Sequence, residues 1–277
     1  PNRACETSQE LAVVADFPRL PGAFRPGDPP GSVFKVAVGS AALERGSIRP
    51  DDQFGCPPAI EIGNLTFHNW KKTDRGELNF VEALTQSCDT WFYQVGIKTG
   101  AAPIIEWARK LGFGAKCGIP LRGEADGRVP DDQYMKATHG RKLLNGDIAN
   151  LSIGQGDVLV TPLQMAQSMA IVANGGTFYQ TRLVQQVQTI DNKIVTAYQV
   201  RAKKTLNPSP ATMKQLHTGM IDAGNGPAGT AQQASVEGVC VAGDTGRAQG
   251  GTRDKESQDR WDGGLRPGEG EFRKRGP

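Results

Sequence analysis

The run Pro29-Pro30-Gly31-Ser32-Val33-Phe34-Lys35 constrains the fold of this chain more than any other stretch. Pro-Pro-Gly cannot lie inside a helix, so a helix carrying the apolar residues 36–43 must begin after it. Ser32 is a suitable N-cap, and Gly46 is suited to end a helix in the left-handed conformation. We therefore predict a helix from Ser32 to about residue 45, with Ser32 and Lys35 one turn apart on the same face.

This spacing suits nucleophilic chemistry. A hydroxyl at the positive end of a helix dipole forms an alkoxide at lower cost, and a partly desolvated lysine nearby accepts its proton. The alternative is an ordinary capped helix with a surface lysine, because Ser-x-x-Lys is common by chance. The rest of the chain has to decide between the two.

Length and composition narrow the class of protein. A chain of 277 residues forms one large or two small domains. Its net charge of +3, with scattered rather than clustered Lys and Arg, argues against nucleic acid as a partner. The sequence contains no run that approaches 18 apolar residues and no secretory signal. Because it starts at Pro1, we expect a fragment. Five cysteines without a repeating spacing argue against a full disulfide framework.

Hydrophobic periodicity predicts the elements that follow. We predict strands at 10–15 and 236–242, a hairpin of 178–190 with 194–200, and an irregular surface excursion over 115–150. Residues 249–277 carry thirteen Asp, Glu, Lys or Arg and only three large apolar residues, so we predict a disordered tail there. The predicted helices cover 79–86, 90–98, 101–111, 162–173 and 210–223.

Three short motifs in order resemble those of the transpeptidase domain of penicillin-binding proteins. Ser32-Val33-Phe34-Lys35 resembles the family's S-x-x-K. Ser87-Cys88-Asp89 resembles its second motif, and Gly243-Asp244-Thr245-Gly246-Arg247-Ala248-Gln249 resembles G-K-T-G-T-A-Q. The blocks 151–156, 161–166, 173–176 and 229–231 also match. The similarity is closest to the monofunctional (class B), elongation-type members, the branch of penicillin-binding protein 2.

The resemblance implies an α+β fold shared with serine β-lactamases: a central antiparallel sheet flanked by helices, with an all-α subdomain. It implies a D,D-transpeptidase acting on D-Ala-D-Ala stem peptides of peptidoglycan, inhibited by β-lactams. Ser32 is then the nucleophile, Lys35 its base and Ser87 the proton relay, with Asp89 in the same motif. The backbone N–H groups of Ser32 and Arg247 would hold the oxyanion. Membrane proteins of cell-wall synthesis as partners and the periplasmic face of the bacterial inner membrane are implied too.

The third motif departs from the family pattern. Asp244 stands where the family has a lysine that favours the substrate's carboxylate, within the expected substrate-binding group Asp244, Thr245, Gly246 and Arg247. Losing that attraction and adding a repulsion costs on the order of a few kcal/mol, roughly a hundredfold in acylation. Arg247 replaces a threonine and either restores part of the positive charge or blocks the groove.

The domain boundaries and the metal expectation follow from the same comparison. We expect an unassigned segment at 1–9, an incomplete transpeptidase domain at 10–248 that lacks its last strands, and the charged tail at 249–277. Relatives carry a Zn site near 55–88, where this chain retains Cys56 and Cys88 but has Asn69 and Arg75 at the other ligand positions. Two ligands do not make a structural Zn site, so we expect no cofactor and buried thiols instead.

One misleading match and two alternative functions need to be named. A literal Lys98-Thr99-Gly100 follows a predicted helix, so we interpret Lys98 as a cation at a helix C-terminus rather than the third motif. The chain could be a non-catalytic module that serves as a scaffold in cell-wall synthesis. It could also be a serine β-lactamase or D,D-carboxypeptidase on the same fold.

Overall fold

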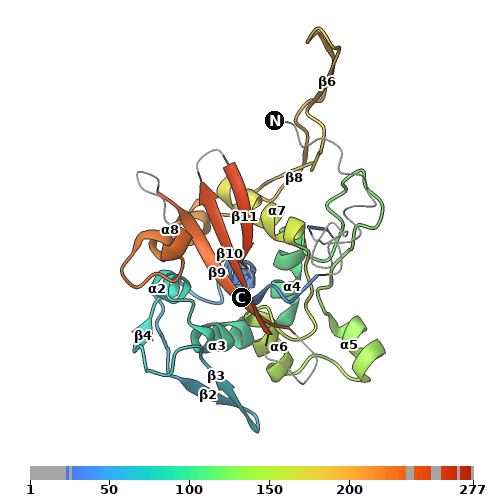
Figure 1. The fold of residues 1–277 in the computed structure, drawn as a ribbon. Coiled ribbons are helices and arrows are strands. Elements are labelled where there is room, and N and C mark those ends of the chain that lie inside the picture. The colour runs from blue at the N-terminus through green and yellow to red at the C-terminus, as the bar shows by residue number, and fades with distance from the viewer. Residues whose placement is uncertain (1–22, 25–26, 235–239, 251–256, 267–268, 276–277) are drawn as a thin grey trace.

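The computed structural model describes residues 23–24, 27–234, 240–250, 257–266 and 269–275. Their organising element is a three-stranded antiparallel sheet in the order β11-β10-β9. Figure 1 shows the three strands side by side, in red, with α8 (Pro210–Asn225) beside β9. α7 (Pro162–Ala173) packs against β10 and β11. The strands are β9 (Ala242–Gly250), β10 (Ser257–Arg266) and β11 (Glu269–Arg275).

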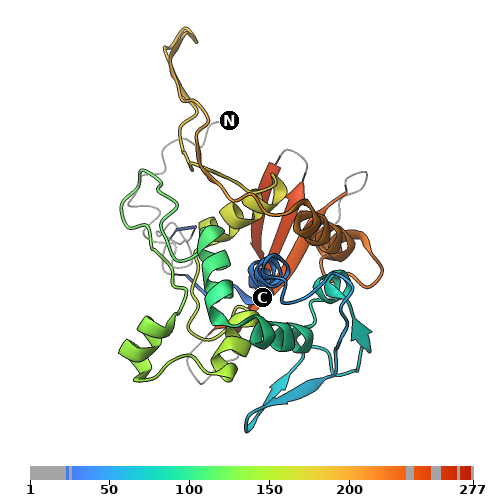
Figure 2. The same ribbon diagram turned by 180° about the vertical axis from the view of Figure 1, so that it is seen from behind.

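The first helical segment is the centre of the core. It begins as a 3₁₀ turn, η1 (Gly31–Phe34), and continues as α1 (Lys35–Arg45). Nearly every α1 residue is buried because the sequence is apolar or small all round, which is typical of a helix enclosed by other elements. Figure 2 shows this helix, in dark blue, at the centre of the molecule in front of the sheet. η1 contacts β9, and α1 contacts α3 (Asp89–Thr99), α4 (Ala101–Lys110) and α8.

The helical half is built from elements that the sequence marks well. Asn79 caps α2 (Phe80–Thr85) in a reciprocal capping box with Glu82. Thr161 does the same for α7 with Gln164, and Pro162 occupies the first turn. α5 (Asp132–His139) and α6 (Asn145–Ser152) complete this half, and α6 packs on α3.

Short antiparallel pairs decorate the body. β5 pairs with β8 and β6 with β7, so 177–205 forms an interrupted hairpin that projects from the body in both views (Figures 1 and 2). β1 pairs with β4 and β2 with β3 next to α3. Their bounds are β1 (Phe54–Gly55), β2 (Ala59–Ile62), β3 (Leu65–His68), β4 (Glu77–Leu78), β5 (Thr177–Tyr179), β6 (Gln186–Gln188), β7 (Ile194–Ala197) and β8 (Ala202–Thr205). A short 3₁₀ helix, η2 (Gln232–Ala234), follows α8.

Most predicted helices are confirmed within two residues at each end, and two other expectations are wrong. The excursion 115–150 contains α5 and most of α6, whose polar sequences hid them. Ser32 lies within η1 and caps nothing, since Pro30 occupies the N-cap position. Gly46 does end α1, with a φ of 70°. The strand predicted at 10–15 lies outside the described residues.

The charged tail is the largest correction. β10 and β11 occupy most of 257–275. The expectation of a disordered tail is therefore wrong for these residues, and so is the expectation that the domain lacks its last strands. The boundary expected at residue 248 falls inside β9. The charged composition led to a wrong prediction of disorder, because strands pair through backbone N–H and C=O groups, which every residue except proline supplies. A pre-existing strand, β9, supplies the partner.

Candidate active site

Ser32 lies partly exposed at the start of the central helix. Its neighbours Val33 and Phe34 are fully buried, which fixes η1 in the core and leaves the serine at the surface of the site. Gly31 has a φ of 59°, and its N–H donates to the carbonyl of Gly154 at 3.0 Å. A Cβ on Gly154 would lie 2.1 Å from the Gly31 carbonyl oxygen, so only glycine permits this approach. The turn before Ser32 is therefore set by close backbone packing.

Lys35 is fully buried and points toward the second motif. Its Nζ donates to Asp89 Oδ1 at 2.6 Å, to Ser87 Oγ at 3.0 Å and to the Ser87 carbonyl at 2.9 Å. These three acceptors match the three N–H donors of an ammonium group. The ammonium also lies 5.3 Å from the centre of the Phe92 ring. The amine of Lys35 is therefore directed at the second motif and not at bulk water.

Ser87 and Asp89 are held in place by strained and buried structure. Ser87 has a φ of 51°, a left-handed conformation that is sterically unfavourable for serine, and it precedes the start of α3. This turn directs both its carbonyl and its hydroxyl toward Lys35. Asp89 Oδ2 accepts the Trp70 N–H at 3.1 Å, and the Asp89 N–H donates to Asn69 Oδ1 at 3.1 Å. Both oxygens of Asp89 are thus occupied.

The strand β9 closes the other side of the site. A Cβ on Gly246 would lie 2.8 Å from the Pro30 carbonyl oxygen and 3.4 Å from the Val33 nitrogen, so β9 runs against η1 on both sides of Ser32. Thr245 Oγ1 donates to Thr230 Oγ1 at 3.0 Å, which ties β9 to the segment after α8. The nucleophile candidate and the third motif are therefore adjacent, although 211 residues separate Ser32 from Gly243 in sequence.

Asp244 is buried at the same place. It is 1% exposed, and one oxygen, Oδ1, accepts the Thr245 N–H at 2.8 Å. The other oxygen, Oδ2, is buried without a hydrogen-bond partner in the described part of the chain. Burial raises the pKa of this carboxyl to about 7, against the opposing effects of Lys35 and the Thr245 N–H, with Asp89 adding to the rise.

The comparisons with known proteins agree with this geometry. The profile of the family described as "Penicillin binding protein transpeptidase domain" matches residues 9–265. The chain belongs to this family. The resemblance drawn from the three motifs is therefore confirmed, and so is the α+β fold of the family.

Named relatives of this penicillin-binding-protein domain point to one branch. The peptidoglycan D,D-transpeptidase MrdA of Haemophilus influenzae is 30% identical over 226 residues, which cover 80% of this chain and 34% of that protein. The MrdA of Escherichia coli is 29% identical over 232 residues, covering 82% and 36%. This chain spans about a third of the length of the curated relatives that it matches.

Solved structures of the family share the fold. Penicillin-binding protein 2 of Helicobacter pylori, in complex with MreC, aligns with a TM-score of 0.78 and 28% identity, covering 92% of this chain and 46% of that one. Penicillin-binding protein A of M. tuberculosis, as a ceftriaxone acyl-enzyme complex, aligns with a TM-score of 0.79 and 27% identity, covering 93% and 56%.

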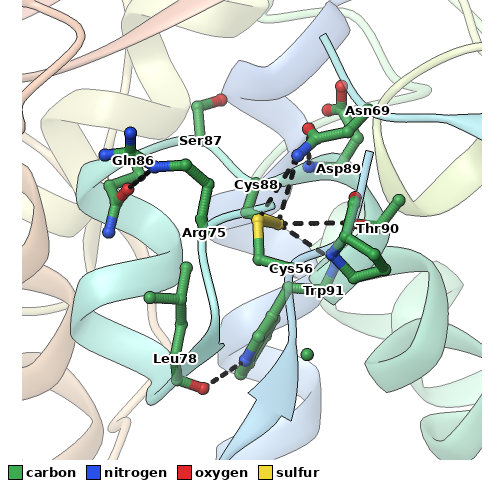
Figure 3. The surroundings of a disulfide bond; sticks show 12 residues. Cys56, Asn69, Arg75, Leu78, Gln86, Ser87, Cys88, Asp89, Thr90 and Trp91 are labelled. Carbon is green, nitrogen blue, oxygen red and sulfur yellow. Dashed lines mark hydrogen bonds between the residues drawn. A yellow bond between two sulfur atoms is a disulfide. The ribbon is translucent and has the colours of Figure 1, made fainter. Parts of the chain in front are cut away.

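A disulfide lies directly behind the second motif of this penicillin-binding-protein domain. Cys56 and Cys88, which the sequence suggested as remnant Zn ligands or buried thiols, are bonded to each other. Asn69 Nδ2 donates to both sulfurs while its Oδ1 accepts from Asp89, as Figure 3 shows. Cysteines in a disulfide are not available as thiolate ligands. Within the described residues there is no group of three or more His, Cys, Asp or Glu that could hold a metal ion.

Sequence reasoning missed the supporting residues of the second motif. Asn69 and Trp70 hold Asp89 through backbone and side-chain hydrogen bonds, and Trp70 Nε1 also donates to the Ser87 carbonyl at 3.1 Å. No spacing rule links Asn69 to the second motif. The only sign in the sequence that Asn69 has a role was that it replaces an expected Zn ligand. Lys98 lies in the last turn of α3 before Gly100, over the Phe54 ring, and is not part of the site. The side chain of Arg247 is outside the described residues.

Proposed function

We propose that this chain is the transpeptidase domain of a peptidoglycan D,D-transpeptidase and that Ser32 is its nucleophile. The observation that supports it best is the convergence of three distant segments: Lys35 binds Ser87 and Asp89, while Gly246 packs against the turn that carries Ser32. A structural helix cap would need none of these contacts. Family membership and the names of the relatives support the same activity.

The proposed reaction is acyl transfer. Ser32 Oγ bonds to the carbonyl carbon of the penultimate D-alanine, the amide bond to the terminal D-alanine breaks, and the serine proton reaches the leaving amine through Lys35 and Ser87. An amine of a second stem peptide then attacks the ester, forms a new amide and returns the proton to Ser32. The backbone N–H groups of Ser32 and Arg247 hold the oxyanion. β-Lactams acylate the same serine.

The roles assigned to the second motif follow from its contacts. Lys35 directs all three N–H donors of its ammonium group at Ser87 and Asp89, so it must first lose a proton to solvent before the neutral amine can take the serine proton. Ser87 Oγ is the exchangeable partner, because it is a neutral hydroxyl that also accepts and donates protons. Asp89 is a positioning residue that keeps the lysine directed into the site.

The proposed setting is the periplasmic face of the inner membrane, with membrane proteins of cell-wall synthesis as partners. Support comes from relatives alone: one structural neighbour is in a complex with MreC, and another belongs to a peptidoglycan synthase complex. No helix among the described residues is long and apolar enough to cross a membrane.

A non-catalytic scaffold is the second candidate, and Asp244 is the observation that favours it. An anion at the third motif opposes binding of an anionic acyl donor. The two candidates differ in one measurable property, which is whether Ser32 forms a covalent ester.

Labelling with a fluorescent penicillin tests the proposal. The protein is incubated with the probe, denatured and resolved on a gel, and we expect a covalent band that disappears in Ser32→Ala. The matched control is Ser47→Ala, which removes a hydroxyl from the turn after α1 and should label like the parent. No band at high probe concentration would reject the transpeptidase in favour of the scaffold. Rapid turnover of nitrocefin would instead indicate a β-lactamase.

A further inference from the structure

One oxygen of Asp244 is buried at the site without a partner. Oδ1 accepts the Thr245 N–H, whereas Oδ2 receives no hydrogen bond from the described residues. Leaving an ionised carboxylate oxygen unpaired in a buried place is costly, so the group is stable there either as a neutral acid or with a ligand donor. This carboxyl is therefore suited to change its charge within the range of neutral pH.

Among the side chains that the structure describes, two charged groups act on Asp244. Lys35, from α1, favours the ionised form, and Asp89, at the start of α3, opposes it. Burial outweighs both the lysine and the Thr245 N–H, and brings the pKa of the Asp244 carboxyl to about 7. On the other elements around it, η1 has no charged residue, and the β10 residue paired with Asp244 is Gly263. α8, which packs on β9, carries Lys214, His217 and Asp222, and none of the three contributes to the shift.

The lysine does not neutralise Asp244 directly. Lys35 donates its three hydrogen bonds to Ser87 and Asp89, so its charge is already matched by one carboxylate. With Asp244 protonated, the ammonium and the two carboxyl groups sum to zero. With Asp244 ionised, the same three groups carry one net negative charge beside Ser32.

We propose that Asp244 is a specificity-determining residue that makes acceptance of anionic acyl donors depend on its own protonation. While it is neutral, an anionic donor approaches an uncharged site; once it ionises, that donor meets an added negative charge. A neutral donor is indifferent to the change. This inference rests on the proposed acylation of Ser32 and adds to it the charge class of the donor.

The expected size follows from Coulomb's law. As a scale, two like charges separated by about 8 Å at an effective dielectric of about 20 repel each other enough to slow a reaction about thirtyfold. Screening by salt and water lowers this factor, so we expect at least about a tenfold effect at physiological ionic strength. A change of this size is easily measured in a labelling rate.

The test compares two forms of one fluorescent penicillin: the free acid, which is anionic, and its methyl ester, which is neutral. Second-order labelling rates are measured for both between pH 5.5 and 8.5. Taking the ratio of acid to ester removes the effects that both probes share, such as the reactivity of Ser32, and leaves the effects that depend on the charge of the probe. We expect the ratio to fall about tenfold or more, with a midpoint near pH 7.

Asp244→Asn provides the matched variant, because the amide is isosteric and has no charge at any pH in this range. Its ratio should stay level, and its labelling rate by the acid should exceed that of the parent above pH 7. Asp51→Asn, which removes an exposed carboxylate from a turn, should behave as the parent does.

The outcomes are distinct for the two proposals. If the ratio of acid to ester labelling in the parent does not change with pH, the proposed role of Asp244 is overturned. This result is obtained with the parent protein alone, so it does not depend on whether a variant folds. An equal fall in Asp244→Asn overturns it as well, because another group would then be responsible. Labelling of Ser32 by neither probe would overturn the proposed function and this inference with it. If only the acid labels Ser32, the test is its labelling rate above pH 7. A higher rate in Asp244→Asn than in the parent supports the proposal, and equal rates overturn it.

Discussion

The Nζ of Lys35 lies 2.6 Å from Oδ1 of Asp89, and this ion pair joins the centre of the core to the start of α3. The lysine is fully buried and the aspartate side chain is 12% exposed. A buried pair is strongly destabilising to break, because the remaining charge has no water to solvate it. The contact therefore serves the fold as well as the site.

Removing one member of this pair tests that dual role. We expect Asp89→Asn to lower the free energy of unfolding by about 3 kcal/mol, since Lys35 keeps its charge but loses its anion. Urea unfolding followed by circular dichroism measures this change. Glu106→Gln breaks the exposed pair with Lys110 and should leave stability unaltered. An equally small effect of both variants would contradict the buried-pair argument.

The Cys56–Cys88 disulfide closes a loop whose ends are 32 residues apart and includes the residue between Ser87 and Asp89. We expect the double variant Cys56→Ala/Cys88→Ala to lose about 2–4 kcal/mol of stability. Penicillin labelling should slow too, because the turn that presents Ser87 and Asp89 to Lys35 loses its covalent bond to the segment that follows β1.

Cys240→Ala is the control for the disulfide variant, because this exposed thiol is not in a disulfide and is distant in sequence from the second motif. It should unfold and label like the parent. Mass spectrometry should find two fewer alkylated cysteines in the chain denatured without reductant than in the chain denatured with reductant. Denaturing both samples exposes the buried thiol of Cys117, so its burial does not affect the comparison. Alkylation of Cys56 and Cys88 without reductant would show that the bond is absent.

The pKa of Asp244 makes a prediction for stability as a function of pH. The carboxyl has a pKa near 3.8 in the unfolded chain and about 7 in the folded protein, where burial raises it. Between these values the folded state binds the extra proton, so this group's stabilising contribution falls as pH rises and is lost above 7. Asp244→Asn lacks this dependence.

We therefore expect Asp244→Asn to gain stability over the parent by about 3 kcal/mol between pH 5 and pH 8. Urea titrations of both proteins at each unit of pH provide the comparison. Curves that stay parallel across this range would mean that Asp244 is ionised throughout, or that it is solvated. This measurement needs no ligand and no activity.

The approach of β9 to the serine turn predicts a steric effect. In Gly246→Ala the new Cβ would lie 2.8 Å from the Pro30 carbonyl oxygen, so strand and turn must separate. We expect a loss of about 1–3 kcal/mol in stability and slower penicillin labelling. Gly55→Ala is the control, since its Cβ makes only an ordinary contact of 3.6 Å with Pro57. Equal labelling rates for the two variants would mean that the position of β9 does not affect the reaction at Ser32.

The local sequence alone determined the pieces of this protein. Turn residues, caps and apolar periodicity located the central helix, α7 and α8, and the order of three motifs identified the family. These signals are local, because a cap or a helix face depends on residues within a few positions of each other. They predicted which side chains would form the site without measuring any distance.

Tertiary structure decided what those side chains contact. The pairing of Cys56 with Cys88, the support of Asp89 by Asn69 and Trp70, and the unpartnered oxygen of Asp244 arise between segments far apart in sequence. The strands at 257–275 form for a similar reason, since a charged sequence pairs once β9 presents its backbone edge. Burial and pairing depend on the whole fold, and no window of sequence contains them.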